Sequence, residues 1–286
     1  MSEATPGGAG NTEEASTQVQ LEEALEQGVA GIGGGLIGFV EALGGMLELA
    51  WLAMLAVVRP PYRLGLLFDQ LDFVGVGSIA VVGITGLFSG MVFGVESYNA
   101  FVLFNAQSLV GATVAIALSR ELAPVFAGLM VTARVGSSMA TELGAMRVSE
   151  QIDALTTLAV DPIQYLVSPR IVAATLMMPF LTLLFDAVGI TGAYVVCVVM
   201  NNLSPGLFLG RIKTWVAPTD IIGGMIKGAV FGFLIALIAC YRGYNASGGS
   251  KGVGIATNKA VVAGSVVVLV IDYFLSILLQ PFWGGR

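Results

Sequence analysis

Residues 171–200 read IVAATLMMPFLTLLFDAVGITGAYVVCVVM, an unbroken apolar run whose one charged residue is Asp186. A helix needs about 20 mainly apolar residues to cross a hydrocarbon layer about 30 Å thick, because it rises about 1.5 Å per residue. This stretch is therefore long enough to span a membrane. Four further runs meet the same criterion: 74–95, 108–134, 221–241 and 260–280. The sequence predicts an all-α, polytopic integral membrane protein with about five transmembrane helices.

The overall composition supports that class. The 286 residues are 56% hydrophobic and 11% charged, with a mean hydropathy of +0.87, whereas soluble domains are about 25% charged. The chain has no histidine, which excludes a Ser/His/Asp triad and His-containing zinc sites. We expect a chain that is not an enzyme, has no catalytic residue, binds no metal or cofactor and has no nucleic-acid partner.

No phosphate-binding loop of the pattern G-x-x-x-x-G-K-[ST] occurs in the sequence. The glycines Gly248, Gly249, Gly252 and Gly254 have the wrong spacing for one and predict a tight turn instead. Any coupling to ATP must therefore come from a partner chain.

The N-terminal residues differ from the rest. Residues 1–27 contain six glutamates and no lysine or arginine, which predicts a disordered acidic tail before a membrane domain at 28–286. The tail has neither a basic signal region nor an Arg-rich transit character, which favours a bacterial protein. Residues 28–58 are Gly-rich and apolar with Glu41 and Glu48, and predict an interfacial entry helix. The alternative is that this segment spans the membrane.

Basic residues in the loops predict the orientation, because lysine and arginine stay on the cytoplasmic side. One set of loops holds eight of them and the other set three. The larger set is Arg59, Arg63, Arg134, Arg147, Arg170, Arg242, Lys251 and Lys259; the smaller is Arg211, Lys213 and Arg286. We expect a cytoplasmic N-terminus and a periplasmic C-terminus. If 28–58 spans, the N-terminus moves outside and the loop assignment is unchanged.

Small residues recur every fourth position in several spans, a pattern that lets helix backbones approach closely in lipid. The predicted packing positions are Gly86, Gly90, Gly94, Gly128, Gly136, Gly144, Gly228 and Gly232. They serve packing either within one subunit or along the seam of a homodimer.

Residues 120–155 read RELAPVFAGLMVTARVGSSMATELGAMRVSEQIDAL, a long block of mixed polar and apolar residues. This block closely resembles the MlaE/YrbE permease family of MCE-associated ABC transporters. Further matches are GLFSGMVFGVE at 86–96, DPIQYLVSPR at 161–170, KGAVFG at 227–232 and GGSKGVGIATNKAVV at 248–262, with Asp272 downstream. The resemblance covers nearly all of the chain from about residue 70 onward.

The resemblance implies a homodimeric permease of the bacterial inner membrane that moves phospholipid or similar hydrophobic molecules and serves outer-membrane lipid asymmetry. It implies two partners, a cytoplasmic ABC ATPase through which ATP and magnesium act and a periplasmic MCE-domain protein. It leaves room for a small STAS-type regulatory subunit.

Residues 147–158 lie between the second and third predicted spans. Val148, Ile152 and Leu155 recur at helical spacing, which predicts a short amphipathic helix begun by Ser149 and ended by Asp161-Pro162. The resemblance gives this helix an ATPase-coupling role, with contacts from Arg147, Glu150, Gln151, Asp153 and Leu155. The alternative is a surface helix that seals the cytoplasmic face.

Arg120, Glu121 and Lys227 fall inside predicted spans, where a charge is costly and usually faces a partner or a wet cavity. We expect Glu121 to pair with Lys227 across helices, and all three to line the outer part of a substrate pathway. The alternative for Lys227 is that it snorkels to the outer end of its helix.

Two other functions remain open from the residues alone. In a proton-coupled secondary transporter of a hydrophobic substrate, Glu121, Asp186 and Asp272 would form a proton relay, although no inverted repeat is apparent. A non-transporting scaffold is the third alternative, against which the intramembrane charges argue.

Overall fold

The computed structural model describes residues 38, 40–60 and 63–283. Those residues are overwhelmingly helical, and no β-strand occurs among them. Residues Leu49–Arg286 form one compact unit, and the packing below is that of its described residues. The predicted tail at 1–27 and the terminal Arg286 lie outside the described residues.

Six helices among the described residues are long and apolar enough to cross a membrane, which confirms the all-α polytopic prediction. They are Val40–Val58, Leu64–Val102, Gln107–Val148, Ile163–Met200, Pro218–Tyr244 and Gly249–Pro281. The first of these falls within the predicted interfacial segment 28–58, and its 19 residues also satisfy the length of a span. The length of this helix suits an interfacial helix and a membrane span equally, so both alternatives remain.

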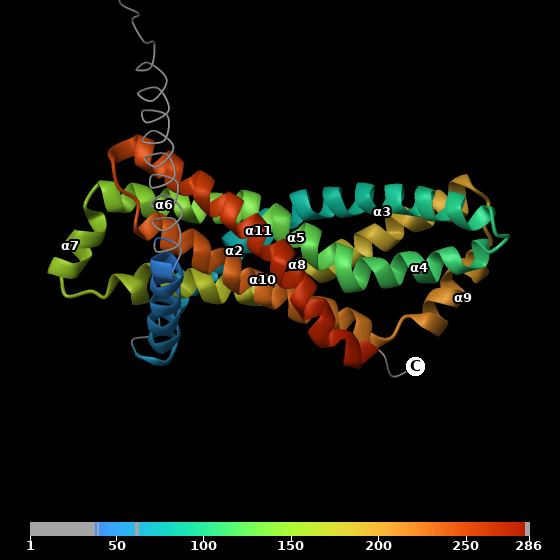
Figure 1. The fold of residues 1–286 in the computed structure, drawn as a ribbon, viewed down its shortest axis with the longest axis horizontal. Coiled ribbons are helices and arrows are strands. Elements are labelled where there is room, and N and C mark those ends of the chain that lie inside the picture. Colours follow the sequence, from blue (N-terminus) through green and yellow to red (C-terminus); the bar gives the residue numbers. More distant parts are fainter. Residues whose placement is uncertain (1–37, 39, 61–62, 284–286) are drawn as a thin grey trace, which may run out of the picture. The chain divides into compact units, whose positions relative to one another are not determined.

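Several of these long helices consist of shorter elements that follow one another (Figure 1). Before the loop that carries α7 lie α2 (Leu64–Val74), α3 (Ile79–Val102), α4 (Val110–Ala117), α5 (Ala123–Val131) and α6 (Ser137–Val148). From there on lie α7 (Gln151–Thr157), α8 (Ser168–Tyr194), α9 (Pro205–Trp215), α10 (Pro218–Tyr244) and α11 (Gly249–Trp283).

Turns of π-helix join α4 to α5 at Leu118–Leu122 and α5 to α6 at Thr132–Gly136, and they extend α8 at its two ends, at Ile163–Val167 and Val195–Met200. Two of them end two residues before a proline, Pro124 or Pro169. Proline has no backbone N–H, so the carbonyl four residues earlier loses its helical partner. A wider turn is one way for the chain to continue past that position without breaking the helix.

The second predicted span, 108–134, is too short, because the helix runs without interruption from Gln107 to Val148. Its 42 residues rise about 63 Å, twice the thickness of a hydrocarbon layer. Polar residues past the predicted end have partners on other helices. Arg134 donates to the carbonyl oxygen of Phe73 at 3.0 Å and to Ser78 Oγ at 2.9 Å, and Glu142 pairs with Arg170 at 2.9 Å. The helix therefore has no need to end at Arg134.

Close backbone contacts hold α8 between α3 and α10. A Cβ atom on Gly90 of α3 would overlap the backbone of Gly189, and one on Gly232 of α10 would overlap the carbonyl oxygen of Ala174. The other predicted packing glycines also face helices of the same chain: Gly86, Gly94 and Gly228 face α8, Gly136 faces α10, and Gly128 and Gly144 face α11. In the described chain these positions all serve packing within one subunit.

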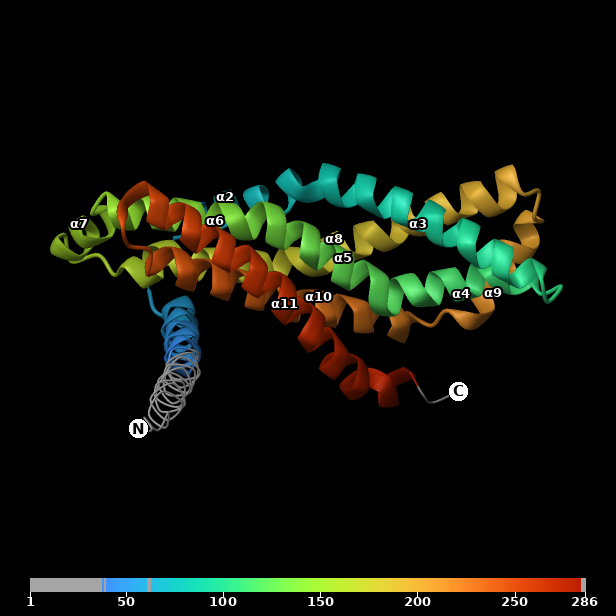
Figure 2. The same ribbon diagram turned by 45° about the horizontal axis from the view of Figure 1, so that its top comes forward.

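The two ends of the Leu49–Arg286 unit carry different connections. Figures 1 and 2 show α7 and the α10–α11 turn at one end, and α9 with the α3–α4 connection at the other. The predicted glycine turn is shorter than expected. Gly248 and Gly249 adopt positive φ angles of 87° and 69°, but Gly252 and Gly254 already belong to α11, where nothing lies within 4 Å of a Cβ built on Gly254.

Candidate functional site: a polar cluster beside an apolar cavity

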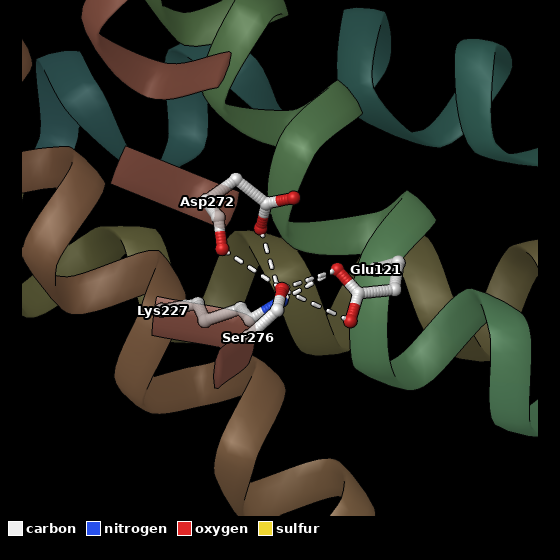
Figure 3. A network of polar contacts seen from close by, with 4 residues as sticks. All are labelled: Glu121, Lys227, Asp272 and Ser276. Atoms are coloured by element: carbon white, nitrogen blue, oxygen red, sulfur yellow. Dashed lines mark hydrogen bonds and ion pairs between the residues drawn. The ribbon is translucent and has the colours of Figure 1, made fainter. Parts of the chain in front are cut away.

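A buried lysine of α10 joins the π turn Leu118–Leu122 and α11 (Figure 3). Lys227 Nζ donates to Glu121 Oε2 at 2.6 Å, to Asp272 Oδ1 at 3.0 Å and to Ser276 Oγ at 2.7 Å. The Ser276 hydroxyl also lies within donating distance of Glu121, 3.0 Å from Oε2, and of the carbonyl oxygen of Asp272 at 2.8 Å. The predicted Glu121–Lys227 pair is thus confirmed, with Asp272 as a second carboxylate on the same ammonium group.

The positions of these side chains follow from helix geometry. Asp272 and Ser276 are four residues apart on α11 and therefore share one face. Glu121 comes from the π turn between α4 and α5, and Lys227 from α10. The side chain of Lys227 is 0% exposed, whereas that of Glu121 is 41% exposed. A buried ammonium needs such partners, because leaving it unpaired in an apolar interior costs several kcal/mol.

A second ion pair lies beside the first. Arg120 Nε and Nη2 donate to Asp220 Oδ1 at 3.0 and 2.8 Å. The other oxygen of Asp220 accepts the backbone N–H of Ala217 at 2.8 Å, which satisfies a free donor at the start of α10. The Arg120 guanidinium also lies 5.0 Å from the ring centre of Trp283, within the range of a cation–π contact.

A cavity of about 760 Å³ opens next to both ion pairs. Figure 2 shows the C-terminal part of α11, which supplies one wall, diverging from α4 and α10. Most of the lining is apolar or aromatic: Leu109, Ala112, Ile116, Ala117, Trp215, Tyr273, Ile277 and Trp283. The remaining lining residues are polar: Thr113, Arg120, Glu121, Ser276 and Gln280. Such a cavity fits an elongated apolar molecule that carries a polar group.

The three residues predicted for the substrate pathway have different positions. Arg120 and Glu121 line the cavity, but Lys227 does not; it contacts the lining through Glu121, Ser276 and the ring of Trp283. Lys227 does not snorkel to the end of its helix either, because its ammonium group is fully buried. Two carboxylates hold Lys227 behind the cavity lining, and its place on a substrate pathway stays a prediction.

Sequence reasoning missed several residues of this site. Asp220, in the Pro-Thr-Asp start of α10, carried the signal of an acidic residue in a first helical turn. Ser276 carried a weaker signal, its spacing of four from Asp272. Nothing local marked Trp215, Tyr273, Gln280 and Trp283, which meet the cavity only through the tertiary fold.

The third acid considered for a proton relay is separate from this cluster. Asp186 is buried on α8 with 4% of its surface exposed and forms no ion pair with any described residue. No group of three or more His, Cys, Asp or Glu side chains able to hold a metal ion occurs within the described part of the chain.

The predicted coupling segment is shorter than 147–158. Arg147 and Val148 end α6, and α7 comprises Gln151–Thr157. Ser149 does not begin the helix, because its hydroxyl donates back to the carbonyl oxygen of Ala145 at 2.7 Å. Glu150 occupies the preceding position with φ 59°, and this left-handed residue makes the sharp change of direction.

The other end of α7 also differs from the prediction. The helix stops at Thr157, well before Asp161-Pro162, and Ala159 adopts a positive φ of 57°. The Asp161 carboxylate instead accepts the N–H of Ile163 at 2.9 Å and so begins the next helical segment.

The surface of α7 is mostly polar. Ile152 is buried and Leu155 half-buried, while Glu150, Gln151 and Asp153 are exposed. Arg147 reaches across the turn to Asp153, with Nη1 and Oδ1 2.6 Å apart. The segment therefore projects from the end of the unit as a short turn with one anchored face (Figure 1).

Long apolar helices with an internal ion-pair cluster define a multi-pass integral membrane protein. Comparison with known families makes the assignment specific. The family model described as permease MlaE matches residues 67–278, and the chain belongs to the MlaE permease family.

Relatives from three sources agree with this. A probable ABC transporter permease protein of Rickettsia felis is 43% identical over 245 residues, covering 86% of this chain and 95% of the relative. The intermembrane phospholipid transport system permease protein MlaE of Haemophilus influenzae is 34% identical over 252 residues, covering 88% and 97%. The chloroplastic protein TRIGALACTOSYLDIACYLGLYCEROL 1 of Arabidopsis thaliana is 39% identical over 208 residues, covering 73% and 59%.

Proposed function

We propose that this chain is the permease subunit of an ABC transporter that moves phospholipid, or a similarly amphipathic molecule, across or out of the bacterial inner membrane. It is a transport subunit and not an enzyme. It works with a second copy of itself, a cytoplasmic ATPase that binds the ATP and magnesium, and a periplasmic MCE-domain protein, with room for a STAS-type subunit. The N-terminus is cytoplasmic and the C-terminus periplasmic, unless the first helix spans.

The observation that carries the proposal is the cavity beside Arg120 and Glu121. Its apolar wall suits acyl chains, and its polar lining includes Arg120 and the hydrogen-bonded pair Glu121 and Ser276. The name of the Haemophilus relative, a phospholipid transport system permease, supports the same class of substrate. Arg120 is the group that we assign to an anionic headgroup, because a guanidinium matches phosphate oxygens in charge and geometry.

The proposed coupling element is α7 with the preceding turn. Glu150, Gln151 and Asp153 form its exposed polar face, Arg147 braces Asp153, and Leu155 and Ile152 anchor the opposite face. An ATPase that engages this face could move α6 and α8 together, because α7 lies between them in the chain. The polar cluster around Lys227 lies further along the same bundle of helices.

Lipid crosslinking in the assembled transporter tests the pathway. A photoreactive phenylalanine analogue placed at Ile277, which lines the cavity, should crosslink a labelled phospholipid. Arg120→Gln and Glu121→Gln should each reduce the crosslink yield several-fold, whereas Lys213→Met, an exposed cation outside the site, should leave it unchanged. Equal yields from all three variants would end the assignment of these residues to the pathway.

A charge-reversal experiment tests the coupling role. Glu150→Lys and Asp153→Lys should leave the chain folded and the cavity crosslink intact, but should separate ATP hydrolysis from lipid movement in reconstituted vesicles. Unchanged ATPase binding and unchanged lipid transport in both variants would show that α7 is only a surface helix.

Proton-driven uptake remains the second candidate, since two carboxylates share one ammonium group at Lys227. It predicts substrate accumulation by the purified chain alone under an imposed pH gradient. Transport that requires the ATPase and ignores the gradient would exclude it.

A further inference from the structure

The turn between α10 and α11 lies at the end of the unit that also carries α7 (Figures 1 and 2). Two adjoining hollows lie between the end of α10 and the first part of α11. Their volumes are about 390 Å³ and 210 Å³. Arg242 and Lys259 line both of them. The two hollows are distinct from the cavity beside Arg120, because they share no lining residue with it.

The charges at these hollows have one sign. Among the described lining residues two are cations, Arg242 and Lys259, and two are amides, Asn245 and Asn258, while none is acidic. Arg242 and Lys259 form no ion pair with any described residue. The Nε atom of Arg242 is buried without a hydrogen-bond partner. This N–H group of Arg242 therefore lacks the acceptor that buried donors normally find.

The surroundings combine the end of one apolar helix with the exposed apolar side of another. Arg242 lies in the last turn of the apolar helix α10, two residues before Tyr244. Beyond Lys259, α11 presents Val262, Val266 and Leu269, all exposed, at spacings that place them along one side of the helix. Val262 and Ala263 line the larger hollow. A cationic hollow thus continues directly into an exposed apolar ridge.

We propose that these hollows bind the phosphate headgroup of an anionic phospholipid from the surrounding leaflet, with its acyl chains along the Val262–Leu269 side of α11. Basic pockets between helices at a membrane surface suit such headgroups. The apolar ridge favours a lipid over a soluble phosphate. The two cations line a hollow instead of standing on a flat surface, which favours a headgroup over an acidic protein surface. The inference needs only that the chain lies in a membrane, and it does not depend on the proposed transport function.

A local crosslink separates this site from the main cavity. The full-length chain, with a photoreactive phenylalanine analogue at Val262, is reconstituted without any ATPase in phosphatidylcholine vesicles that contain a small fraction of labelled phosphatidylglycerol. We expect strong crosslinking to phosphatidylglycerol, and little when labelled phosphatidylcholine replaces it. Each basic residue near an anionic lipid is worth about a fivefold gain in affinity, so Arg242→Gln with Lys259→Gln should weaken binding about 25-fold.

The matched control is Lys251→Gln, which removes one cation from the same turn but lines neither hollow. It should change the crosslink less than twofold. Equal labelling by both lipids, or an unchanged yield in the double variant, would overturn the proposal. Full protection by millimolar glycerol phosphate would assign the hollows to a soluble phosphate. Intact lipid labelling in the double variant, together with lost ATPase binding in a separate assay with the ATPase added, would assign them to a protein partner.

Discussion

Replacing the buried lysine with a neutral side chain of similar length tests whether the polar cluster is an ionic network. Lys227→Met removes three hydrogen bonds, to Glu121, Asp272 and Ser276, and leaves two carboxylates facing each other. Breaking a buried ion pair on one side typically costs about 3–5 kcal/mol. Because the Glu121 side chain is 41% exposed, water can take over part of its solvation. We therefore expect the lower end, about 3 kcal/mol, or about 150-fold in the unfolding equilibrium.

The assay is reversible unfolding of the purified chain in mixed micelles with increasing denaturing detergent. Lys213→Met makes the same chemical change at an exposed position and should stay within about 0.5 kcal/mol of the parent. The triple variant Lys227→Met, Glu121→Gln and Asp272→Asn removes all three charges and should recover most of the loss, because a neutral set is often as stable as a buried ionic one. A single variant as stable as the parent, or a triple variant no better than the single one, would refute the ionic account.

Three further perturbations follow from local geometry. Gly90→Ala should destabilise the chain by about 1–3 kcal/mol in the same unfolding assay, because its Cβ would overlap the backbone of Gly189. The control Gly83→Ala, whose Cβ would have nothing within 4 Å, should be neutral or stabilising. Equal effects of the two substitutions would contradict the packing of α3 on α8. Asp220→Ala should cost about 1–3 kcal/mol, since it strands Arg120 and the N–H of Ala217; a neutral result would show that water replaces the carboxylate. Glu150→Gly should stabilise the chain by about 1 kcal/mol, because glycine accepts φ 59° without strain, and a loss of stability would point to an undetected role for the side chain in folding.

Much of the fold was predictable because lipid imposes a simple rule on sequence. A run such as 171–200 must be a helix in a membrane, since its backbone groups have no other partners there. The lengths were not predictable from the same rule. Arg134 and Glu142 resemble the end of a span, but each finds a partner brought near by the tertiary fold, Phe73 and Ser78 in one case and Arg170 in the other. A charge ends a span only when no such partner is present.

The site was predictable in part for a related reason. Glu121 and Lys227 are recognisable because each is costly alone in a membrane and the two have opposite charge. Asp220 was not, because an acidic residue near the start of a helix has a sufficient local explanation as a cap, and its bond to Arg120 joins positions 100 residues apart. Residues with two roles are hidden from sequence reasoning whenever the first role already accounts for them.

The π turn at Leu118–Leu122 carries two neighbouring residues that both line the cavity. Consecutive residues of an α-helix point about 100° apart, so Arg120 and Glu121 would not be expected to share a face. Both nevertheless line the cavity, and both find partners on α10, Asp220 for Arg120 and Lys227 for Glu121. Those partners are seven residues apart, two helical turns and about 10 Å along one side of α10. Arg120 and Glu121 therefore reach in opposite directions along α10, one to Asp220 and the other to Lys227. These two ion pairs fix the cavity wall at both ends. Any movement of α10 past α4 and α5 must strain both pairs at once, so the polar cluster ties the shape of the cavity to the position of α10.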